Sequence, residues 1–414
     1  MTRTERSYYL LFGFYCVGWS VTTPMYALFL LSRGLDLLEI NLVLATYLIT
    51  AFVFEVPTGA VADLAGRRLS FVLSCGLRAA AFALYAFAHS FGDCVIAEFI
   101  DAVGTTLASG ALDAWAIDGM RAEGNTRPAD RFFARAQILA RTLMIGGALM
   151  GGYVAQRRME FTWFTGTAVF SATAIAALML MREPPDVAPR RRPHWTGVHR
   201  SVGRTTREAL TTVRDHPILL LLCIVTLTAS FGIMPIHMLW QPRLKALTGE
   251  GTWFMAWVWA FLSIASIIGS ALMPRLLGRY GRAAVLTAAS LWRAVMLVIA
   301  GVAITVYPVI AGLLLQEMAF GLSEPLLQAW MNEHVEAERR ATVLSVRAMS
   351  FTLGGGTGLV CIGWIARDIG MSAAWVTSGI VVGLTAAGFV VLARAGRRPT
   401  SEAAAVELVP PAVS

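Results

Sequence analysis

Twelve apolar stretches follow one another along the chain, separated mostly by short polar connections. An α-helix needs about 20 consecutive apolar residues to cross a bilayer, whereas barrel strands are about half as long and alternate in polarity. The pattern therefore predicts an all-α membrane protein with twelve transmembrane helices. The first stretch is expected to be a retained helix because it lacks a small-residue cleavage site. The stretches cover residues 8–31, 39–61, 70–89, 94–115, 133–155, 162–181, 217–240, 252–272, 284–304, 308–331, 344–366 and 373–394.

The composition excludes a large soluble domain. Only 14% of the residues are charged and 57% are hydrophobic, whereas soluble domains carry about 25% charged residues. The five cysteines and six histidines are dispersed without metal-ligand spacing, so neither a metal site nor a cofactor is expected. The sequence contains no phosphate-binding G-x-x-x-x-G-K-[ST] loop, no catalytic constellation typical of an enzyme and no compact basic domain typical of nucleic-acid binding.

Basic residues are distributed unevenly between the two expected sides of the membrane. With both termini in the cytoplasm, 24 of the 34 fall on cytoplasmic segments, 6 on outside loops and 4 within helices. Lys and Arg accumulate on the cytoplasmic side of membrane proteins. We therefore predict a multi-pass protein of the cell membrane with both termini cytoplasmic.

The chain repeats itself at an offset of 215 residues. Three features recur at equivalent places: Gly66-Arg67 as Gly281-Arg282, Arg78 as Arg293, and Ala114-Trp115 as Ala329-Trp330. Duplicated halves with a substrate site between them are typical of transporter folds. We expect two pseudo-symmetric six-helix bundles, at residues 1–181 and 217–394. A charged cytoplasmic linker at 182–216 joins them, and a disordered cytoplasmic tail follows at 395–414.

A motif between the second and third stretches carries a family resemblance. Residues 59–68 read Gly-Ala-Val-Ala-Asp-Leu-Ala-Gly-Arg-Arg, which resembles the loop signature G-x-x-x-D-R-x-G-R-R of the major facilitator superfamily. Leu64 replaces the usual arginine of the signature. With the helix count, linker and repeat, the resemblance covers essentially the whole chain. It implies a central cavity exposed alternately to the two sides of the membrane. The matching residues are Gly59, Asp63, Gly66, Arg67 and Arg68.

The same motif predicts a charged latch on the cytoplasmic side. Gly59 allows helices to approach closely, and Gly66 allows a tight turn with positive φ. The two arginines that follow can supply positive charge to Asp63 and to Asp118. The resemblance implies that this ion-pair network holds one half against the other until the cytoplasmic side opens. Simple anchoring of the topology by the arginines is the alternative.

A glycine-rich segment in the fifth stretch has two interpretations. Residues 146–152 read Gly-Gly-Ala-Leu-Met-Gly-Gly, which looks like the antiporter signature of drug-exporting members of the superfamily without its usual proline. Close helix packing explains such glycines equally well. Both interpretations stay open at this point.

Four acids lie inside the expected helices and are candidates for proton coupling. A charge at mid-membrane costs roughly 2.5–3.5 kcal/mol on insertion scales, so such residues are functional candidates by default. The acids form two pairs in repeat-related stretches, and each pair shares one helical face, where neighbouring acids favour retention of one proton. Asp101 and Glu317 are the leading candidates, and fixed salt bridges between helices are the alternative. The four are Asp101, Glu317, Glu98 and Glu324.

Aromatic and basic residues within the helices are candidates for the substrate cavity. Trp19 and Tyr26 lie seven residues apart on one face of the first stretch, where they can contact amphiphilic or cationic ligands. The intramembrane arginines Arg78, Arg141 and Arg293 are the other candidates. Aromatic residues also form belts at the membrane interface for structural reasons.

An ion gradient is the expected driving force. The resemblance favours proton-coupled export of small amphiphilic, drug-like or natural-product compounds, with the compound, protons and the lipid bilayer as partners. The intramembrane arginines favour instead ion-coupled uptake of a nutrient or small anion. Ile100 stands where many proton-coupled exporters of the family carry an arginine. We expect a monomer without enzymatic activity; a substrate sensor with the same fold is a further alternative.

Reporter fusions test the predicted orientation. Green fluorescent protein fused to the C-terminus is expected to fluoresce, and alkaline phosphatase fused there is expected to be inactive, because that end is predicted to be cytoplasmic. The same reporters inserted at His89, in a predicted outside loop, are expected to give the opposite result. The reverse pattern at both positions would contradict the orientation.

Overall fold

Membrane-length helices make up nearly all of the described chain. The computed structural model describes residues 1–124, 129–182, 213–214, 217–333 and 340–395. Within these ranges it contains twelve helical spans long and apolar enough to cross a membrane, and no strand. The predicted all-α fold is confirmed. The predicted linker and tail lie, apart from their first residues and residues 213–214, outside the described residues.

The first half supplies six spans. They consist of α1 (Arg3–Ser20) with the 3₁₀ helix η1 (Thr23–Met25) and α2 (Tyr26–Ser32), α3 (Leu37–Ala65), α4 (Arg67–Ala86), α5 (Phe91–Ala108) with α6 (Ala111–Ala122), α7 (Ala129–Ala155) and α8 (Glu160–Leu180).

The second half supplies the other six. They are α10 (Pro217–Thr248), α11 (Thr252–Tyr280), α12 (Arg282–Val302), α13 (Val306–Glu333), α14 (Arg340–Asp368) and α15 (Met371–Ala395). Most of these helices extend several residues beyond the predicted apolar stretches, because their polar ends continue the helix past the apolar core.

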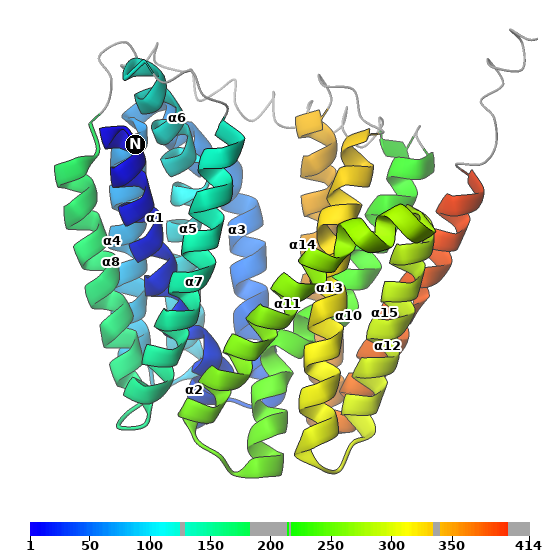
Figure 1. Cartoon of the computed structure of the whole chain (residues 1–414). Coiled ribbons are helices and arrows are strands. Elements are labelled where there is room, and N and C mark those ends of the chain that lie inside the picture. The colour runs from blue at the N-terminus through cyan, green and yellow to red at the C-terminus, as the bar shows by residue number, and fades with distance from the viewer. Residues whose placement is uncertain (125–128, 183–212, 215–216, 334–339, 396–414) are drawn as a thin grey trace, which may run out of the picture.

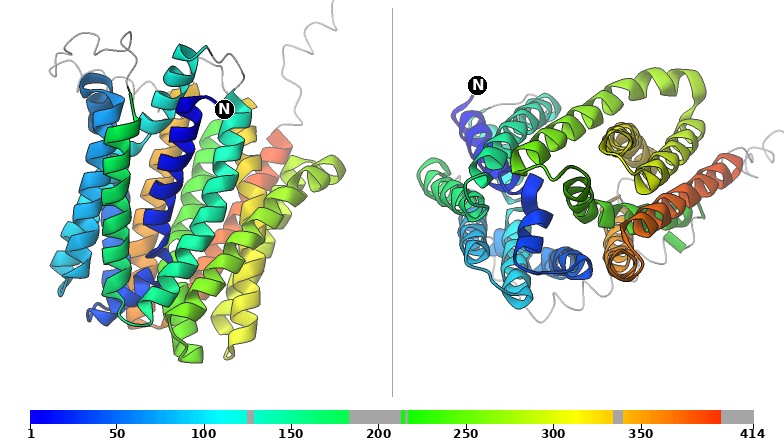
Figure 2. Two further views of the ribbon diagram at one scale, coloured as in Figure 1. Left: turned by 60° about the vertical axis from the view of Figure 1, so that its left-hand side comes forward. Right: turned by 90° about the horizontal axis from the view of Figure 1, so that it is seen from below.

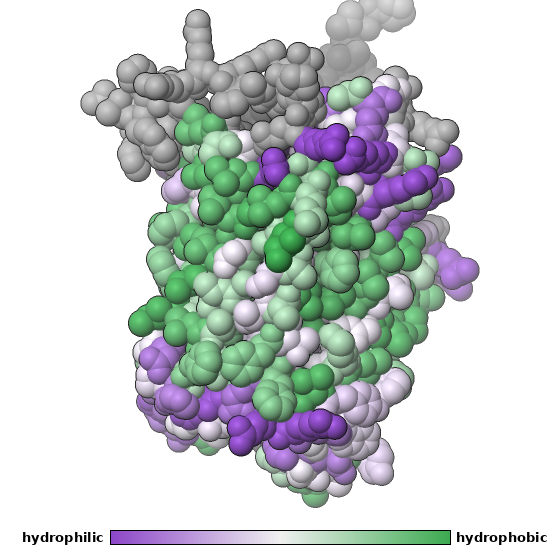
Figure 3. All heavy atoms as spheres, turned by 90° about the vertical axis from the view of Figure 1, so that its left-hand side faces the viewer, coloured by the Kyte–Doolittle hydropathy of each residue, from purple (hydrophilic) through white to green (hydrophobic). Residues whose placement is uncertain are grey.

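The two halves form two helix bundles that lie side by side (Figure 1). The bundles contact each other chiefly through α3 against α14 and α7 against α11. The face at which α1 begins and α15 ends is here called the N-terminal face, and the other is called the opposite face; Figure 2 shows the latter from below. Figure 3 shows a broad hydrophobic band between two hydrophilic ends, as a protein that spans a bilayer requires.

Local sequence explains where several helices begin. Capping boxes begin α1 with Thr2 and Glu5, α3 with Asp36 and Glu39, and α5 with Ser90 and Asp93. In each, the first side chain accepts from the helix backbone and the acid accepts from the capping residue, so free backbone donors are satisfied.

The repeated Gly-Arg pair forms the same turn in both halves. Gly66 separates α3 from α4 with φ 95°, and Gly281 separates α11 from α12 with φ 74°. Glycine adopts this left-handed region at no steric cost. The positive φ that the sequence suggested for Gly66 is therefore present, together with its repeat.

Two spans are interrupted, contrary to the continuous stretches predicted at 8–31 and 94–115. The first breaks at η1, where Pro24 has no N–H for helical hydrogen bonding. The fourth breaks between α5 and α6, where Gly110 has φ 69°. Hydropathy does not register either break because apolar residues continue on both sides.

The glycine-rich segment of α7 packs closely against two helices. A Cβ atom at Gly151 would overlap the carbonyl oxygen of Val21, and one at Gly152 would overlap the Ala256 side chain of the other bundle. A Cβ at Gly146, in contrast, would meet nothing within 4 Å. Close packing thus accounts for the second glycine pair and not for Gly146.

Two matched substitutions test this packing. Gly151→Ala is expected to lower stability by about 1–3 kcal/mol because the added methyl group overpacks α7 against the first span. Gly146→Ala is expected to leave stability unchanged or slightly raised, since alanine favours the helix. Thermal unfolding of both variants in the same detergent gives the comparison. Equal melting temperatures would contradict the packing explanation.

Candidate substrate cavity

A cavity of about 550 Å³ lies between the two bundles. Both halves line it with aromatic side chains and a smaller set of polar ones, the combination typical of small-molecule sites. Trp19, Tyr26 and Arg141, three of the five predicted cavity residues, are in the lining. The aromatic lining residues are Trp19, Tyr26, Tyr47, Phe82, Tyr85, Trp163, Trp240, Trp259, Phe320 and Phe351. Ionisable and amide groups in the lining are Glu98, Asp101, Arg141, His237, Gln241, Gln316 and Glu317.

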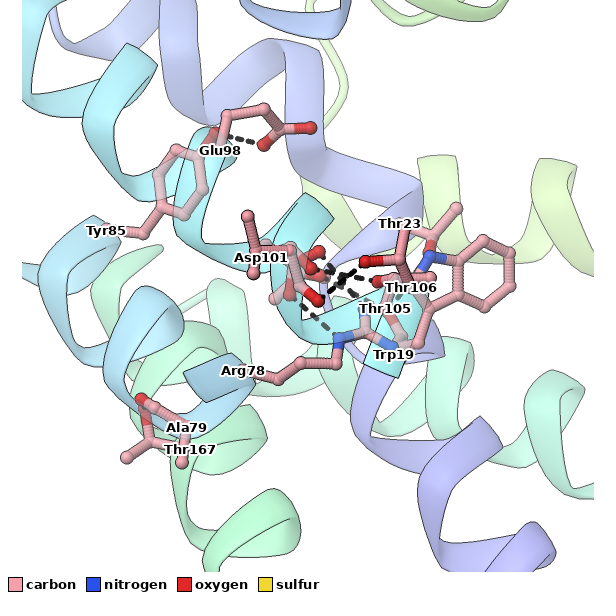
Figure 4. Close-up of polar contacts among 12 residues, drawn as sticks. Trp19, Thr23, Arg78, Ala79, Tyr85, Glu98, Asp101, Thr105, Thr106 and Thr167 are labelled. Atoms are coloured by element: carbon pink, nitrogen blue, oxygen red, sulfur yellow. Dashed lines mark hydrogen bonds and ion pairs between the residues drawn. The ribbon is translucent and has the colours of Figure 1, made fainter. Parts of the chain in front are cut away.

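Arg78 lies behind the cavity wall and forms a bidentate ion pair with Asp101. Its Nε donates to Oδ1 at 2.8 Å and its Nη2 to Oδ2 at 3.2 Å, joining α4 to α5 (Figure 4). Arg78 is 2% exposed, and its guanidinium lies 4.5 Å from the ring centroid of Phe170 and 5.0 Å from that of Tyr15. Asp101, a leading candidate for proton coupling, thus has its charge matched by Arg78.

Glu98, one helical turn from Asp101, has a different environment. The Tyr26 hydroxyl donates to its Oε2 at 2.8 Å, and the Tyr85 hydroxyl donates to the same oxygen. Tyr85 is itself stacked on Trp163 with centroids 4.2 Å apart. Among the described residues, no cation lies within 4 Å of Glu98. This carboxyl is held by two phenols and faces the cavity.

The second half contains the repeat-related arginine without the repeat-related acid. Arg293 corresponds to Arg78, and Gln316 stands where the offset places Asp101. Arg293 is 7% exposed, with Nε and Nη2 lacking hydrogen-bond partners in the described structure, and its guanidinium lies 5.2 Å from the Phe320 centroid. Arg293 and Arg78, both expected in the cavity, are outside its lining.

Glu317 and Glu324 are separated by the structure. Glu317 lines the cavity and accepts a hydrogen bond from Gln316 at 3.0 Å, and no described cation lies within 4 Å of it. Glu324 is outside the lining and forms an ion pair with Arg347 that joins α13 to α14. Of this pair, only Glu317 is therefore placed at the cavity.

The signature motif forms the charge pair predicted between Arg67 and Asp118. Arg67 donates to Asp118 and, at 2.6 Å, to the Ala114 carbonyl oxygen, while Arg68 donates to the Leu178 carbonyl oxygen at 2.5 Å. Arg67 and Asp118 both belong to the first bundle, where α6 packs against α4 after the break at Gly110. The predicted latch between the halves stays a prediction, because it is expected to break when the N-terminal face opens, and in this structure the described contacts between the bundles lie at the opposite face. Asp63 lies in α3, but its side chain is outside the described residues, and a Cβ at Gly59 would meet nothing within 4 Å.

The bundles are instead joined at the opposite face. Gln241 of α10 bonds to the backbone around α2, and Thr252 of α11 donates to the Gly152 carbonyl oxygen of α7 at 2.9 Å. Asp36 and Arg367 approach to 3.9 Å at the surface of the same face. All hydrogen bonds between described residues of the two bundles lie toward this face, where the ribbons converge in Figure 1. The cavity is thus closed toward the opposite face.

Sequence reasoning missed several cavity residues. Gln241 and His237 lie on α10 around the end of the predicted stretch 217–240, and neither was assigned a role from the sequence. Tyr85 and Gln316 lie within apolar stretches and belong to no motif. The repeat offset applied to Asp101 would have pointed to Gln316.

Two helix bundles of membrane-spanning length around a shared cavity are the architecture of a membrane transporter. The sequence profile of the Major Facilitator Superfamily matches residues 8–290 and 254–411, and the chain belongs to this family. The family and the fold point to a transporter and not to an enzyme.

Individual relatives are distant. The uncharacterized MFS-type transporter YxaM of Bacillus subtilis (strain 168) is 25% identical over 227 residues, which are 55% of this chain and 55% of YxaM. The chain thus matches about half the length of that relative. The crystal structure of the nucleoside transporter NupG is similar over 96% of this chain and 100% of its own, with 13% identity and a TM-score of 0.77. A D-xylose-proton symporter is similar over 93% of this chain and 95% of its own, with 14% identity and a TM-score of 0.66. These two likenesses show the fold alone.

The buried ion pair generates a stability prediction. Arg78→Gln is expected to destabilise the protein by about 3–5 kcal/mol because it leaves the Asp101 carboxylate buried without its counter-charge. Combining it with Asp101→Asn is expected to recover most of the loss. Thermal unfolding of the single and double variants forms a double-mutant cycle, and Arg141→Gln, at a position without an ion pair in the described residues, is the control. Equal effects of Arg78→Gln and Arg141→Gln would contradict the prediction.

Proposed function

We propose that the protein exports small amphiphilic compounds, drug-like or natural-product in character, in exchange for protons. One observation carries the proposal. An aromatic cavity contains two carboxyl groups, Glu98 on one bundle and Glu317 on the other, with no ion-pair partner among the described residues. Aromatic faces and carboxylates together suit a ligand with an apolar body and a positive charge.

Proton coupling is assigned to Glu98 and Glu317. A buried carboxyl without a cation binds a proton more readily than one paired with an arginine. Each of these two groups can therefore exchange a proton for the cationic part of a ligand as the cavity changes sides. Asp101 and Glu324 would first have to leave Arg78 and Arg347, so we assign these two pairs to helix anchoring.

The orientation and location belong to the same proposal. The protein is proposed to act in the cell membrane with its N-terminal face in the cytoplasm, supported by the excess of basic residues predicted there. Protons, the solute and the bilayer are its proposed partners, and the monomer is the proposed functional unit. Export then loads the ligand from the N-terminal face, consistent with a cavity closed toward the opposite one.

Ion-coupled uptake of a nutrient or small anion is the second candidate. Arg141 lines the cavity in the middle of α7 without a described ion-pair partner and could bind an anionic group. The solved relatives in this fold include a sugar–proton symporter, so the fold is compatible with both directions.

Proteoliposomes with an imposed pH gradient test the coupling residues. Glu98→Gln and Glu317→Gln are each expected to reduce proton-driven flux of ethidium, an amphiphilic cation, by more than about tenfold, because a neutral amide has no proton to exchange. Ethidium counterflow without a gradient is expected to persist. Glu250→Gln, an exposed acid outside the cavity, is the matched control. Undiminished driven flux in both cavity variants would refute the assignment.

Whole cells separate export from uptake. Cells that make the protein are expected to accumulate less ethidium than cells without it, and a protonophore is expected to abolish the difference because it removes the driving force. Accumulation that rises with the protein and falls with the protonophore would instead support ion-coupled uptake.

A further inference from the structure

The break in the first span leaves backbone donors free at the start of α2. The first N–H groups of any helix lack partners within that helix. A Ser, Thr, Asp or Asn at the N-cap usually accepts a hydrogen bond from the second or third residue. Here the N-cap is Met25, which makes no side-chain cap. The second and third residues of α2 are Ala27 and Leu28.

Gln241 of the other bundle takes the place of that cap. Its Oε1 accepts from the Ala27 N–H at 2.9 Å and from the Leu28 N–H at 3.4 Å. Its Nε2 donates to the Thr23 carbonyl oxygen within η1 at 3.0 Å. Gln241 is only 2% exposed. A single amide from α10 thus satisfies both kinds of backbone group that the break releases.

We infer that Gln241 is the interlock that keeps the opposite face closed. It caps a helix of the first bundle from the second, so the cap exists only while the bundles meet at this face. When that face opens, the Gln241 amide moves away from α2, and entering water becomes the hydrogen-bond partner of the first N–H groups of α2. The inference concerns closure alone and holds for either direction of transport and any coupled ion.

The other polar contacts between the bundles at this face are fewer or more exposed than those of Gln241. Trp257 donates to the Tyr153 hydroxyl at 3.2 Å in an exposed position. The Asp36–Arg367 pair is 3.9 Å apart and surface-exposed, and such pairs contribute little. Thr252 supplies one further buried bond to Gly152. Gln241 supplies three, and all of them go to backbone atoms around the break between η1 and α2.

The interlock also lies beside the cavity. Tyr26, the first residue of α2, donates to Glu98, while the next residue, Ala27, donates to Gln241. The start of α2 is therefore hydrogen-bonded both to Glu98 in the cavity and to Gln241 of the second bundle.

Side-specific labelling tests the interlock. Ser263, which lines the cavity, is replaced by cysteine in a chain whose five native cysteines have been replaced by serine or alanine. A membrane-impermeant thiol reagent is then applied to right-side-out and inverted vesicles. A cysteine at exposed His89, in the loop between α4 and α5, identifies the preparation that presents the opposite face.

Gln241→Leu removes all three bonds and nearly preserves the side-chain volume. Labelling from the opposite face is expected to rise about tenfold, as loss of a cap and buried hydrogen bonds would produce. Labelling from the N-terminal face is expected to fall, because the population shifts between two states. Gln241→Glu keeps the acceptor for α2 and loses the donor to Thr23, so its labelling is expected to lie between that of the parent and that of Gln241→Leu.

Gln328→Ala is the matched control, since Gln328 bonds only to Glu324 of its own helix within the part of the chain that the structure describes; it is expected to label like the parent. Parent-like labelling of Gln241→Leu from both faces would overturn the inference. A rise from both faces would overturn it as well, because that result indicates loosened folding and not a shift between two closed sides.

Discussion

Backbone hydrogen bonding inside the bilayer is the constraint on which this structure depends. Hydrocarbon offers no partner for a free N–H or C=O, so a spanning helix can be interrupted only where protein groups or a water-filled cavity replace the lost bonds. The first span breaks at Pro24, beside the cavity and against α10. The amide of Gln241 meets the requirement from the other bundle, so one local break ties the folding of a helix to the contact between halves.

Buried charges, like free backbone groups, need partners inside the bilayer. The partners of these charges differ between the two repeats. In the first half Arg78 has a carboxylate partner in Asp101, and the pair fixes α4 to α5. In the second half Gln316 stands at the position equivalent to Asp101, Arg293 has no ion pair among the described residues, and the neighbouring acid Glu317 lines the cavity. The two repeat-related halves thus differ. The intramembrane arginine of the first half is paired with a carboxylate, whereas the arginine and the acid of the second half are not paired with each other. Each bundle nevertheless places at the cavity one carboxyl group without a described ion-pair partner, Glu98 in the first and Glu317 in the second.

The sequence predicted what depends on long, regular patterns. Twelve apolar stretches and the repeated Gly66 and Gly281 turns predicted the helices and the two halves, and they also predicted which helices carry the intramembrane charges. It did not predict the breaks at η1 and Gly110, because hydropathy averages over the few residues that form them. Nor did it predict Gln241, whose partners lie more than 200 residues away and offer only backbone atoms. The contact of Arg67 with Asp118 was anticipated, but its place within one bundle follows from the break before α6.

Contacts of the glycines indicate which parts move together. Within each bundle, added Cβ atoms would overlap backbone carbonyl groups: Gly151 that of Val21, Gly321 that of Ser266, and Gly358 that of Phe231. Helices at such backbone-to-backbone separation have no freedom to slide. Between the bundles, the nearest atoms to a Cβ added at Gly152 or Gly363 belong to the side chains of Ala256 and Asn41, and the closest backbone atom, the Thr252 carbonyl oxygen, would lie 3.1 Å from the Gly152 Cβ. Side-chain contacts can be exchanged at low cost, whereas interlocked backbones cannot, so the packing favours two rigid bundles that rock about their interface. The Arg67–Asp118 pair holds α6 to α4 within the first bundle, and the polar contacts between the halves come from the few described groups that cross between them.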